Sequence, residues 1–296
     1  MAGARAGGGV MRALMLDGHA DHPRTRLADR ADSSLRDGEV RVRIEAATLN
    51  PLDAKLAIGA MADWFPIDFP YVPGTDFAGV VEAAGAAVRD LVIGDSVFGR
   101  SDPVRGGAVA NRIVIDADLV ARRPETLSAG QAASLPTPAG VALQVLDMLS
   151  RTDDEPLMIL GDGMVARMAA ALAGDAARLV TDAGDIGRAS DVRHAIDTSG
   201  GPLQAAVLSL LPSGSHLVTL TAPADATIAE ARGVRVDFAV LETSRAQLDR
   251  LALAAERGVL RPHIDHVVAF EEAASVFDRY VARDIAGKIV IEGASR

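Results

Sequence analysis

The stretch Leu157-Met158-Ile159-Leu160-Gly161-Asp162-Gly163-Met164-Val165-Ala166 decides the fold. Four aliphatic residues typical of a buried strand lead into a glycine-rich turn, and an alanine-rich helix follows to about Ala173. Gly161 permits the tight turn, Gly163 lets the backbone approach a pyrophosphate, and Ala166 allows the helix to pack closely. The stretch therefore predicts a parallel sheet of the dinucleotide-binding type, with phosphates at the helix N-terminus. The alternative is a small-residue helix start that binds no ligand.

Asp182 follows the next expected strand, Leu179-Val180-Thr181, at the place where an acid accepts hydrogen bonds from an adenosine ribose. Only about ten residues, 182–191, separate this strand from the next one, near Val192. A crossover between parallel strands normally needs a dozen residues or more. We therefore expect one strand and one helix of the usual fold to be absent. One wall of the adenine pocket would be lost with them, which predicts weakened dinucleotide binding.

The remainder of the chain divides into two patterns. Short strands separated by turns predict a partly open β-barrel, with strands near residues 12–16, 39–44, 77–83 and 111–116 and a turn followed by a strand within 92–99. After residue 124 helices and strands alternate, as in a parallel sheet. Of ten aromatic residues, six precede residue 100 and three follow residue 269, so the two ends of the chain are expected to share one core.

The expected organisation has three parts. Residues 1–10, rich in glycine and alanine, form a flexible leader. The barrel-type domain comprises 11–124 and 262–296, and the shortened nucleotide-binding domain comprises 125–261. The fold class is thus α/β plus β, with the parallel-sheet domain inserted into the split barrel.

The amino-acid composition excludes several classes of partner and active site. Forty acidic and thirty basic residues give a net charge of −10, which argues against nucleic acid or an anionic membrane as the main partner. The chain has no cysteine, so disulfides, thiolate zinc sites and a cysteine nucleophile are excluded. No apolar run approaches the roughly 20 residues of a membrane helix, and we expect a cytoplasmic protein. Lysine occurs only at Lys55 and Lys288 in an arginine-rich chain, which suggests positions that arginine cannot fill.

Five segments in a fixed order carry a family resemblance; they are 48–55 (TLNPLDAK), 69–81 (FPYVPGTDFAGVV), 94–99 (GDSVFG), 197–201 (DTSGG) and 287–291 (GKIVI). They resemble the zinc-independent, quinone-oxidoreductase-like branch of the medium-chain dehydrogenase/reductase superfamily, from Met11 nearly to the end of the chain. The resemblance implies a split GroES-like catalytic domain, an inserted Rossmann domain and often a homodimer. The chemistry it implies is NADPH-dependent reduction of quinones or of alkenes conjugated to a carbonyl. NADP or NAD is thus the expected cofactor, with binding weakened by the shortened sheet.

Zinc is not expected. In zinc-dependent relatives, metal ligands occupy the positions of Asn50, Thr75 and Asp76. None of these residues offers a thiolate or an imidazole. We therefore expect no metal site.

Candidate site residues follow from the residue types and the resemblance together. Asn50 and Lys55 would position or polarise a substrate carbonyl, with Asp53 beside them. Turn capping is the alternative for Asn50 and Asp53, and a surface or packing role is the alternative for Lys55. The resemblance adds cofactor contacts by Thr198 and Lys288.

An aromatic loop supplies the expected substrate contacts. Trp64, Phe65, Phe69 and Tyr71 would form a hydrophobic lid over a small, apolar, carbonyl-containing substrate. The alternative is that these rings only pack the barrel.

Three functions stay open at this point. The first is a reductase that uses NAD(P)H. The second is a repurposed enzyme that performs a cyclisation, isomerisation or dehydration of an apolar substrate without hydride transfer. The third is an inactive binding protein, since a fold does not by itself define a function.

Overall fold

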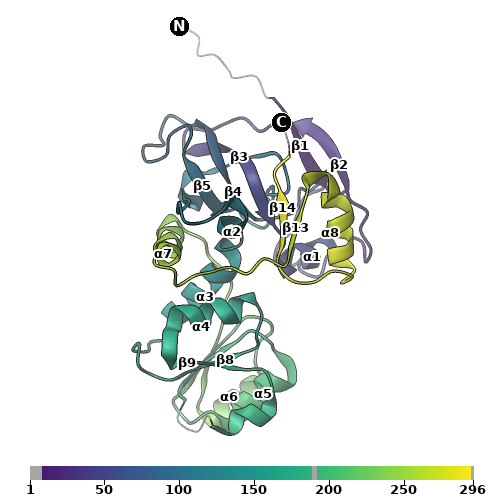
Figure 1. The fold of residues 1–296 in the computed structure, drawn as a ribbon. Coiled ribbons are helices and arrows are strands. Elements are labelled where there is room, and N and C mark those ends of the chain that lie inside the picture. Colours follow the sequence, from purple (N-terminus) through teal and green to yellow (C-terminus); the bar gives the residue numbers. More distant parts are fainter. Residues whose placement is uncertain (1–8, 189–191, 295–296) are drawn as a thin grey trace. The chain divides into compact units, whose positions relative to one another are not determined.

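The computed structural model describes residues 9–188 and 192–294, which form two compact units (Figure 1). The first unit comprises the chain up to Thr137, then Thr243–Glu256 and the chain from Arg261 onward. The second comprises Pro138–Glu242 and Arg257–Leu260. The helices at 129–133 and 245–256 thus belong to the first unit, although the sequence pattern placed both in the nucleotide-binding domain. The domain boundaries drawn from sequence stay a prediction. The expected leader falls mostly in residues 1–8, outside the described residues.

Antiparallel pairing dominates the first unit. Its strands are β1 (Val10–Met15), β2 (Arg26–Ala31), β3 (Glu39–Thr48), β4 (Asp76–Ala84), β5 (Ser96–Arg100), β6 (Arg112–Asp116), β7 (Val120–Arg122), β13 (His266–Val268) and β14 (Ile289–Glu292). Strands β1 and β2 form a hairpin, and the other seven form one sheet in the order β13-β14-β3-β4-β5-β7, with β6 also paired to β3. In the described part of the chain this sheet is open, as in the GroES-like fold.

The C-terminal strand completes this sheet. Strand β14 lies antiparallel to β3, with Val290 opposite Thr48 (Figure 1). Phe270 and Phe277 from the tail are fully buried in the same core as Phe77 from β4. Burying such side chains contributes about 1.5–3 kcal/mol each, so the two ends of the chain stabilise one another.

Short helices cover the sheet of the first unit. They are α1 (Pro51–Ala57), α2 (Ala129–Ala133), α7 (Arg245–Glu256), α8 (Ala273–Val281) and the 3-10 turns η1 (Ala117–Leu119) and η4 (Phe270–Glu272). The segment from Asn50 to Asp53, which sequence reasoning treated as a turn, is the start of α1. Proline is well tolerated at the first helical position because that N–H has no intrahelical partner, so the same residues that signal a turn also begin a helix here.

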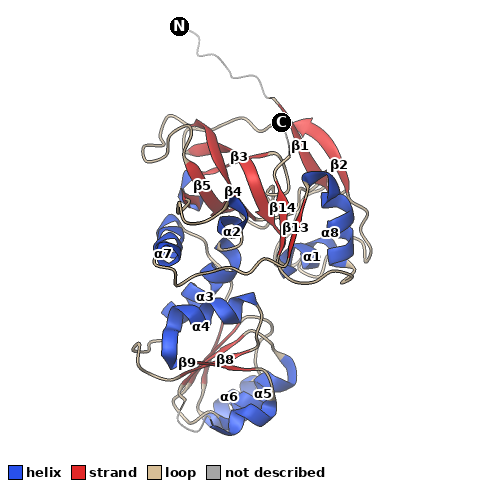
Figure 2. Cartoon of the chain, in the orientation of Figure 1, coloured by secondary structure: helices blue, strands red, loops and turns tan. Residues whose placement is uncertain are grey.

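The second unit is a five-stranded parallel sheet with helices on both faces (Figure 2). Its strands are β8 (Leu157–Leu160), β9 (Ala177–Val180), β10 (His194–Asp197), β11 (His216–Thr219) and β12 (Arg235–Phe238). Its helical segments are α3 (Pro136–Met148, most of it in this unit), α4 (Met164–Ala173), α5 (Gly201–Leu210), α6 (Ala226–Arg232), η2 (Gly174–Ala176) and η3 (Ala183–Arg188). Figure 2 shows α4 on one face of the sheet and α5 and α6 on the other.

The strand order β12-β11-β10-β8-β9 identifies a shortened Rossmann-type sheet. In the usual order 3-2-1-4-5-6, a further strand lies outside the second one. In the described residues β9 is instead the edge, and Arg178 and Leu179 on it are exposed. The crossover from β9 is the short turn η3, with residues 189–191 outside the described part. The shortening expected from the sequence is therefore confirmed.

Among the described helices none has the length and apolar character needed to cross a bilayer. Localisation in the cytoplasm stays a prediction.

Candidate functional site

Asn50 lies in the first unit, between the end of β3 and the start of α1, and its side chain is 5% exposed. Its amide Nδ2 donates to Oδ2 of Asp76 at 3.0 Å, and its Oδ1 accepts a hydrogen bond from Nζ of Lys288 at 3.0 Å. A carboxylate can only accept and an ammonium can only donate, so these two partners fix which way the amide points. Asn50 therefore links two opposite buried charges.

Asp76 is the acidic centre of this cluster and is fully buried. Besides Asn50, its carboxylate accepts hydrogen bonds from the backbone N–H and the hydroxyl of Thr137, at 3.0 and 2.7 Å. Nε of Arg100 lies 3.9 Å from Asp76 and donates to the Thr137 hydroxyl at 3.0 Å. A buried carboxylate requires such donors because desolvation otherwise makes its charge unfavourable.

Asp53, one helical turn into α1, is the less satisfied acid. Its Oδ2 accepts the backbone N–H of Asn50 at 2.7 Å, whereas its buried Oδ1 has no hydrogen-bond partner among the described residues. Burial, together with the negative charge of Asp76, raises the pKa of Asp53 to about 7; the hydrogen bond from Asn50 and the charges of Lys288 and Arg100 act in the opposite direction. Asp53 therefore exchanges a proton near neutral pH.

Lys288 and Arg100 supply the positive charges. Burial lowers the pKa of both side chains, and the nearby carboxylates of Asp76 and Asp53 oppose that effect. Asp265 makes two hydrogen bonds with the backbone of Lys288. Oδ2 of Asp265 accepts the N–H of Lys288 at 2.6 Å, and the N–H of Asp265 donates to the carbonyl of Lys288 at 3.0 Å. The lysine of the cluster is thus held from both its main chain and its side chain.

These donors do not fit zinc. Of the three positions that hold metal ligands in zinc-dependent relatives, Asn50 and Asp76 are engaged with each other, and Thr75 lies 3.4 Å from Asp76 through its hydroxyl. Lys288 and Arg100 already balance the charges of Asp53 and Asp76, so a divalent cation would meet two buried cations. The described residues contain no group of three or more His, Asp or Glu side chains that could hold a metal.

The structure does not bring the other sequence candidates into this cluster. Lys55 is exposed on α1. Tyr71 is buried, and its hydroxyl donates to the carbonyl of Pro103 at 2.7 Å. Phe65 packs partly against the core, Phe69 makes an edge contact with the His19 ring at 4.8 Å, and Trp64 is 63% exposed. Of the four aromatic residues, Trp64 and Phe69 present the most surface to a ligand.

The second unit contains the glycine turn between β8 and α4. Gly161 has φ +103°, a conformation that favours glycine, and a Cβ there would lie 2.6 Å from the hydroxyl of Thr198. Gly163 caps the ten-residue helix α4, and a Cβ there would meet no described atom within 4 Å. The open space at the N-terminus of α4 therefore fits the pyrophosphate of a dinucleotide.

Asp197, at the end of β10, fixes the conformation of the Asp-Thr-Ser-Gly-Gly segment through hydrogen bonds. Its buried carboxylate accepts the backbone N–H groups of Ser199 and Gly200 and the side-chain amide of Gln204. The hydroxyl of Thr198 donates to the carbonyl of Leu160 at 2.6 Å, beside the glycine turn. These contacts hold the two loops together at the C-terminal edge of the sheet, where ligands bind in open α/β sheets.

The adenosine side of the turn is less complete. Oδ1 of Asp182 accepts the backbone N–H of Gly184 at 2.6 Å, and the residue is exposed. Beside β9 no further strand covers this end of the sheet in the described residues. The residues present thus fit the pyrophosphate, but the side of the sheet that would enclose the adenosine lacks a strand in the described residues.

Sequence reasoning missed Arg100 and Thr137. Arg100 ends β5 and is 5% exposed, and Thr137 follows Pro136 at the start of α3. A buried aspartate such as Asp76 needs donors, so an arginine and a threonine at nearby element ends were the available signal.

Comparisons with known proteins agree with this fold. Residues 36–125 match the alcohol dehydrogenase GroES-like domain, and residues 168–291 match the family described as zinc-binding dehydrogenase. A quinone oxidoreductase from Coxiella burnetii has the same fold, with a TM-score of 0.84 at 22% identity over 96% of this chain and 99% of that one. The chain thus has the two-part fold of the medium-chain dehydrogenases.

Two curated relatives are similar over shorter segments. A chloroplastic quinone-oxidoreductase homolog from Spinacia oleracea is 43% identical over 108 residues, which cover 36% of this chain and 33% of that protein. The chloroplastic NADPH-dependent alkenal/one oxidoreductase from Arabidopsis thaliana is 37% identical over 109 residues, which cover 34% and 28%. The matched segments thus span about a third of these relatives. The chain therefore resembles the quinone-oxidoreductase-like members of the medium-chain dehydrogenase/reductase superfamily.

Proposed function

We propose that the protein is an NAD(P)H-dependent oxidoreductase that reduces a quinone or an alkene conjugated to a carbonyl, without zinc. The observation that carries the proposal is the buried Asn50–Lys288–Asp76 cluster, whose ammonium group would supply the positive charge that a metal supplies in zinc-dependent relatives. The printed names of the spinach and Arabidopsis relatives, a quinone-oxidoreductase homolog and an alkenal/one oxidoreductase, support this substrate class.

Lys288 is the group suited to polarising a substrate carbonyl. An ammonium has three N–H donors, and the contact with Asn50 uses one of them. Reduction of a conjugated carbonyl places negative charge on its oxygen, and a fixed cation in a dry site stabilises that charge more strongly than water does. Asn50 and Asp265 are positioning residues that hold Lys288 in place. This assigns to Lys288 the role that the sequence analysis gave to Lys55.

The glycine turn would hold the cofactor. The backbone at Gly163 and the N-terminus of α4 would bind the pyrophosphate, and Asp182 would face the adenosine ribose. When bound, the nicotinamide would supply a hydride to the electron-poor carbon, and a proton from solvent would complete the reduction. Asp53, which is partly protonated near neutral pH, limits the negative charge beside Asp76.

One observation favours a second candidate. Because β9 is the edge of the sheet in the described residues, the adenosine side has lost a wall. A chain that has lost dinucleotide binding could still use the same cluster for a cyclisation, isomerisation or dehydration of an apolar carbonyl compound. Such a reaction would need Lys288 and Asn50 but no hydride.

Cofactor binding separates the two candidates. Titration with NADPH and NADH, followed by fluorescence and by melting temperature, measures affinity; a ligand at 100 times its Kd stabilises by about 2.7 kcal/mol. Consumption of NADPH at 340 nm with 1,4-benzoquinone or an alkenal then measures turnover. The reductase proposal expects both signals. If neither nucleotide binds at millimolar concentration, the non-redox candidate replaces it.

The variants Lys288→Met and Lys55→Met test the role of the cluster. We expect Lys288→Met to lower kcat/KM by tenfold or more while the Kd for NADPH changes little. Lys55→Met should have the smaller effect, because Lys55 is exposed. A larger loss of kcat/KM in Lys55→Met than in Lys288→Met would indicate that Lys55 polarises the carbonyl. Circular dichroism of both variants would check that each is folded.

A further inference from the structure

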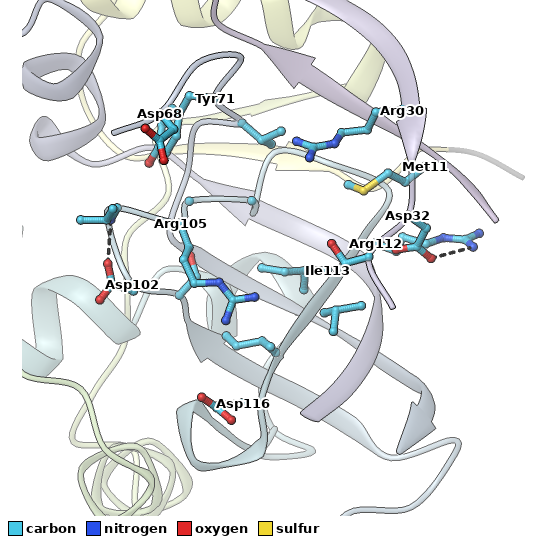
Figure 3. A pocket seen from close by; sticks show the side chains of 18 of the residues that line it. Met11, Arg30, Asp32, Asp68, Tyr71, Asp102, Arg105, Arg112, Ile113 and Asp116 are labelled. Atoms are coloured by element: carbon cyan, nitrogen blue, oxygen red, sulfur yellow. Dashed lines mark hydrogen bonds and ion pairs between the residues drawn. The ribbon is translucent and has the colours of Figure 1, made fainter. Parts of the chain in front are cut away.

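A cavity of about 540 Å³ lies within the first unit, and none of its lining residues belongs to the Asn50–Lys288–Asp76 cluster (Figure 3). It is bounded by the hairpin β1–β2, by β6 and by the loops at 68–72 and 101–107. Its volume falls within the roughly 300–1,000 Å³ typical of small-molecule sites. The proposed function does not use this cavity.

The cavity has an apolar floor and two exposed arginines in its walls. Met11, Val72 and Ile113 contribute apolar surface. Arg30 comes from β2 and Arg105 from the 101–107 loop, and Figure 3 shows their guanidinium groups extending into the hollow from opposite sides. Both arginines are exposed, although the protein as a whole is strongly acidic.

The two arginines are weakly neutralised. Within the described residues no hydrogen bond or ion pair is found for the guanidinium group of Arg30, and the ion pair of Arg105 is a long one, 3.9 Å to Oε1 of Glu39. An unsatisfied guanidinium presents five N–H donors in a planar fork that matches a carboxylate or a phosphate. Two such forks lining one cavity therefore favour an anionic group within it.

The acidic residues of the cavity do not cancel this preference. The buried Asp32 is already paired with Arg41 at 3.0 Å and with Arg112 at 3.7 Å. Asp102 accepts the backbone N–H of Val104 through Oδ1 at 2.7 Å and keeps its charge, but the residue is exposed and solvent screens that charge.

The remaining two carboxylates, Asp68 and Asp116, are exposed. Figure 3 places them at the periphery of the cavity, away from the space between Arg30 and Arg105. Their charges oppose an anion only through solvent, where the interaction is screened.

We propose that this cavity binds a small amphiphilic organic anion, a carboxylate with an apolar body, at a site separate from the Asn50–Lys288–Asp76 cluster. The carboxylate lies between Arg30 and Arg105, and the apolar body covers Met11, Val72 and Ile113. Charge-assisted hydrogen bonds supply selectivity for the anion, and burial of the apolar body supplies most of the remaining affinity.

The probes are sodium octanoate, its neutral analogue octanamide, and inorganic phosphate, titrated calorimetrically into the full chain. We expect octanoate to bind with a submillimolar to millimolar Kd that weakens with added salt. Octanamide should bind at least tenfold more weakly. Equal binding of octanamide would show that the arginines do not contribute. Stronger binding of phosphate than of octanoate would overturn the role of the apolar floor.

Matched variants locate the site. Arg30→Gln and Arg105→Gln should each weaken octanoate binding about three- to tenfold, and the double variant should weaken it more. Arg24→Gln removes the same charge from an exposed residue that does not line the cavity, and it should leave the Kd within twofold. Equal effects of all three single variants, or no octanoate binding at 10 mM, would overturn the proposal. Binding unchanged in Lys288→Met would separate this site from the proposed reductase site, so either proposal can fail alone.

Discussion

The ammonium group of Lys288 donates a hydrogen bond to Oδ1 of Asn50 at 3.0 Å, across 238 positions of the sequence. This contact joins the last strand of the chain to the turn that begins α1. It also gives the two lysines of the protein opposite surroundings, because Lys55 is exposed on α1 and Lys288 is buried.

Amine labelling can read this difference directly. Under native conditions acetic anhydride should modify the exposed Lys55 much faster than the buried Lys288. Burial lowers the pKa of Lys288, which would make its amine more reactive if reagent could reach it. Slow labelling of Lys288 would therefore report restricted access to its amine and not a lack of free amine. Peptide mass mapping before and after unfolding in urea measures both sites, and equal native rates would contradict the buried contact.

Asp53→Asn tests the buried carboxyl group through the pH dependence of stability. The folded-state pKa is raised from 3.8 to about 7, so the folded protein holds this proton more tightly than the unfolded chain does. The contribution of Asp53 to the free energy of unfolding therefore falls as the pH rises from about 4 to about 7. Asparagine keeps an acceptor for the N–H of Asn50 and has no proton to lose.

We expect Asp53→Asn to gain stability relative to wild type between pH 5 and pH 8, by about 1–3 kcal/mol. Urea unfolding of both proteins at the two pH values measures the change. A constant difference between variant and wild type would show that Asp53 does not titrate in this window.

The fold was largely predictable because its deciding segments carry strong local signals. The run 157–160 is wholly aliphatic, and β8 has these same bounds. The aromatic residues at both ends of the chain similarly predicted a shared core. Strand β2 was missed because its residues, Arg26–Ala31, are mostly exposed and lack apolar alternation. Exposed edge strands are defined by their pairing partner and not by their own pattern.

The candidate site was predictable only in part. Asn50 and Asp53 stand in a recognisable segment, but nothing local shows that Asn50 meets Lys288 or that Arg100 becomes buried. In an arginine-rich chain, a single arginine at a strand end resembles a surface residue. Such partners are set by tertiary packing, which brings together β3, β5 and β14.

The two glycines of the turn should respond differently to alanine. Gly161→Ala introduces a Cβ at φ +103°, 2.6 Å from the hydroxyl of Thr198, so we expect a loss of about 1–3 kcal/mol in the free energy of unfolding. Gly163→Ala occupies open space at φ −65° and should change stability by less than about 1 kcal/mol.

The NADPH affinity of Gly163→Ala is the informative measurement. The added methyl group would fill the space into which the pyrophosphate must approach, and we expect the Kd to rise at least tenfold. Differential scanning calorimetry of both variants supplies the stability control. An unchanged Kd in a stable Gly163→Ala protein would show that this turn does not bind the pyrophosphate.

Asp182→Ser tests which nucleotide the second unit prefers. A carboxylate at the end of β9 would accept hydrogen bonds from the ribose of NADH and would repel the 2′-phosphate of NADPH. Serine removes the charge and keeps an oxygen near Gly184, whose N–H the aspartate now binds at 2.6 Å. We expect the Kd for NADPH to fall about three- to tenfold and the Kd for NADH to rise. Asp175→Ser removes one charge from the exposed turn η2 of the same unit and is the matched control. Equal changes in the two variants would indicate a general charge effect. Low-micromolar NADPH binding that neither variant alters would mean that Asp182 does not face the ribose.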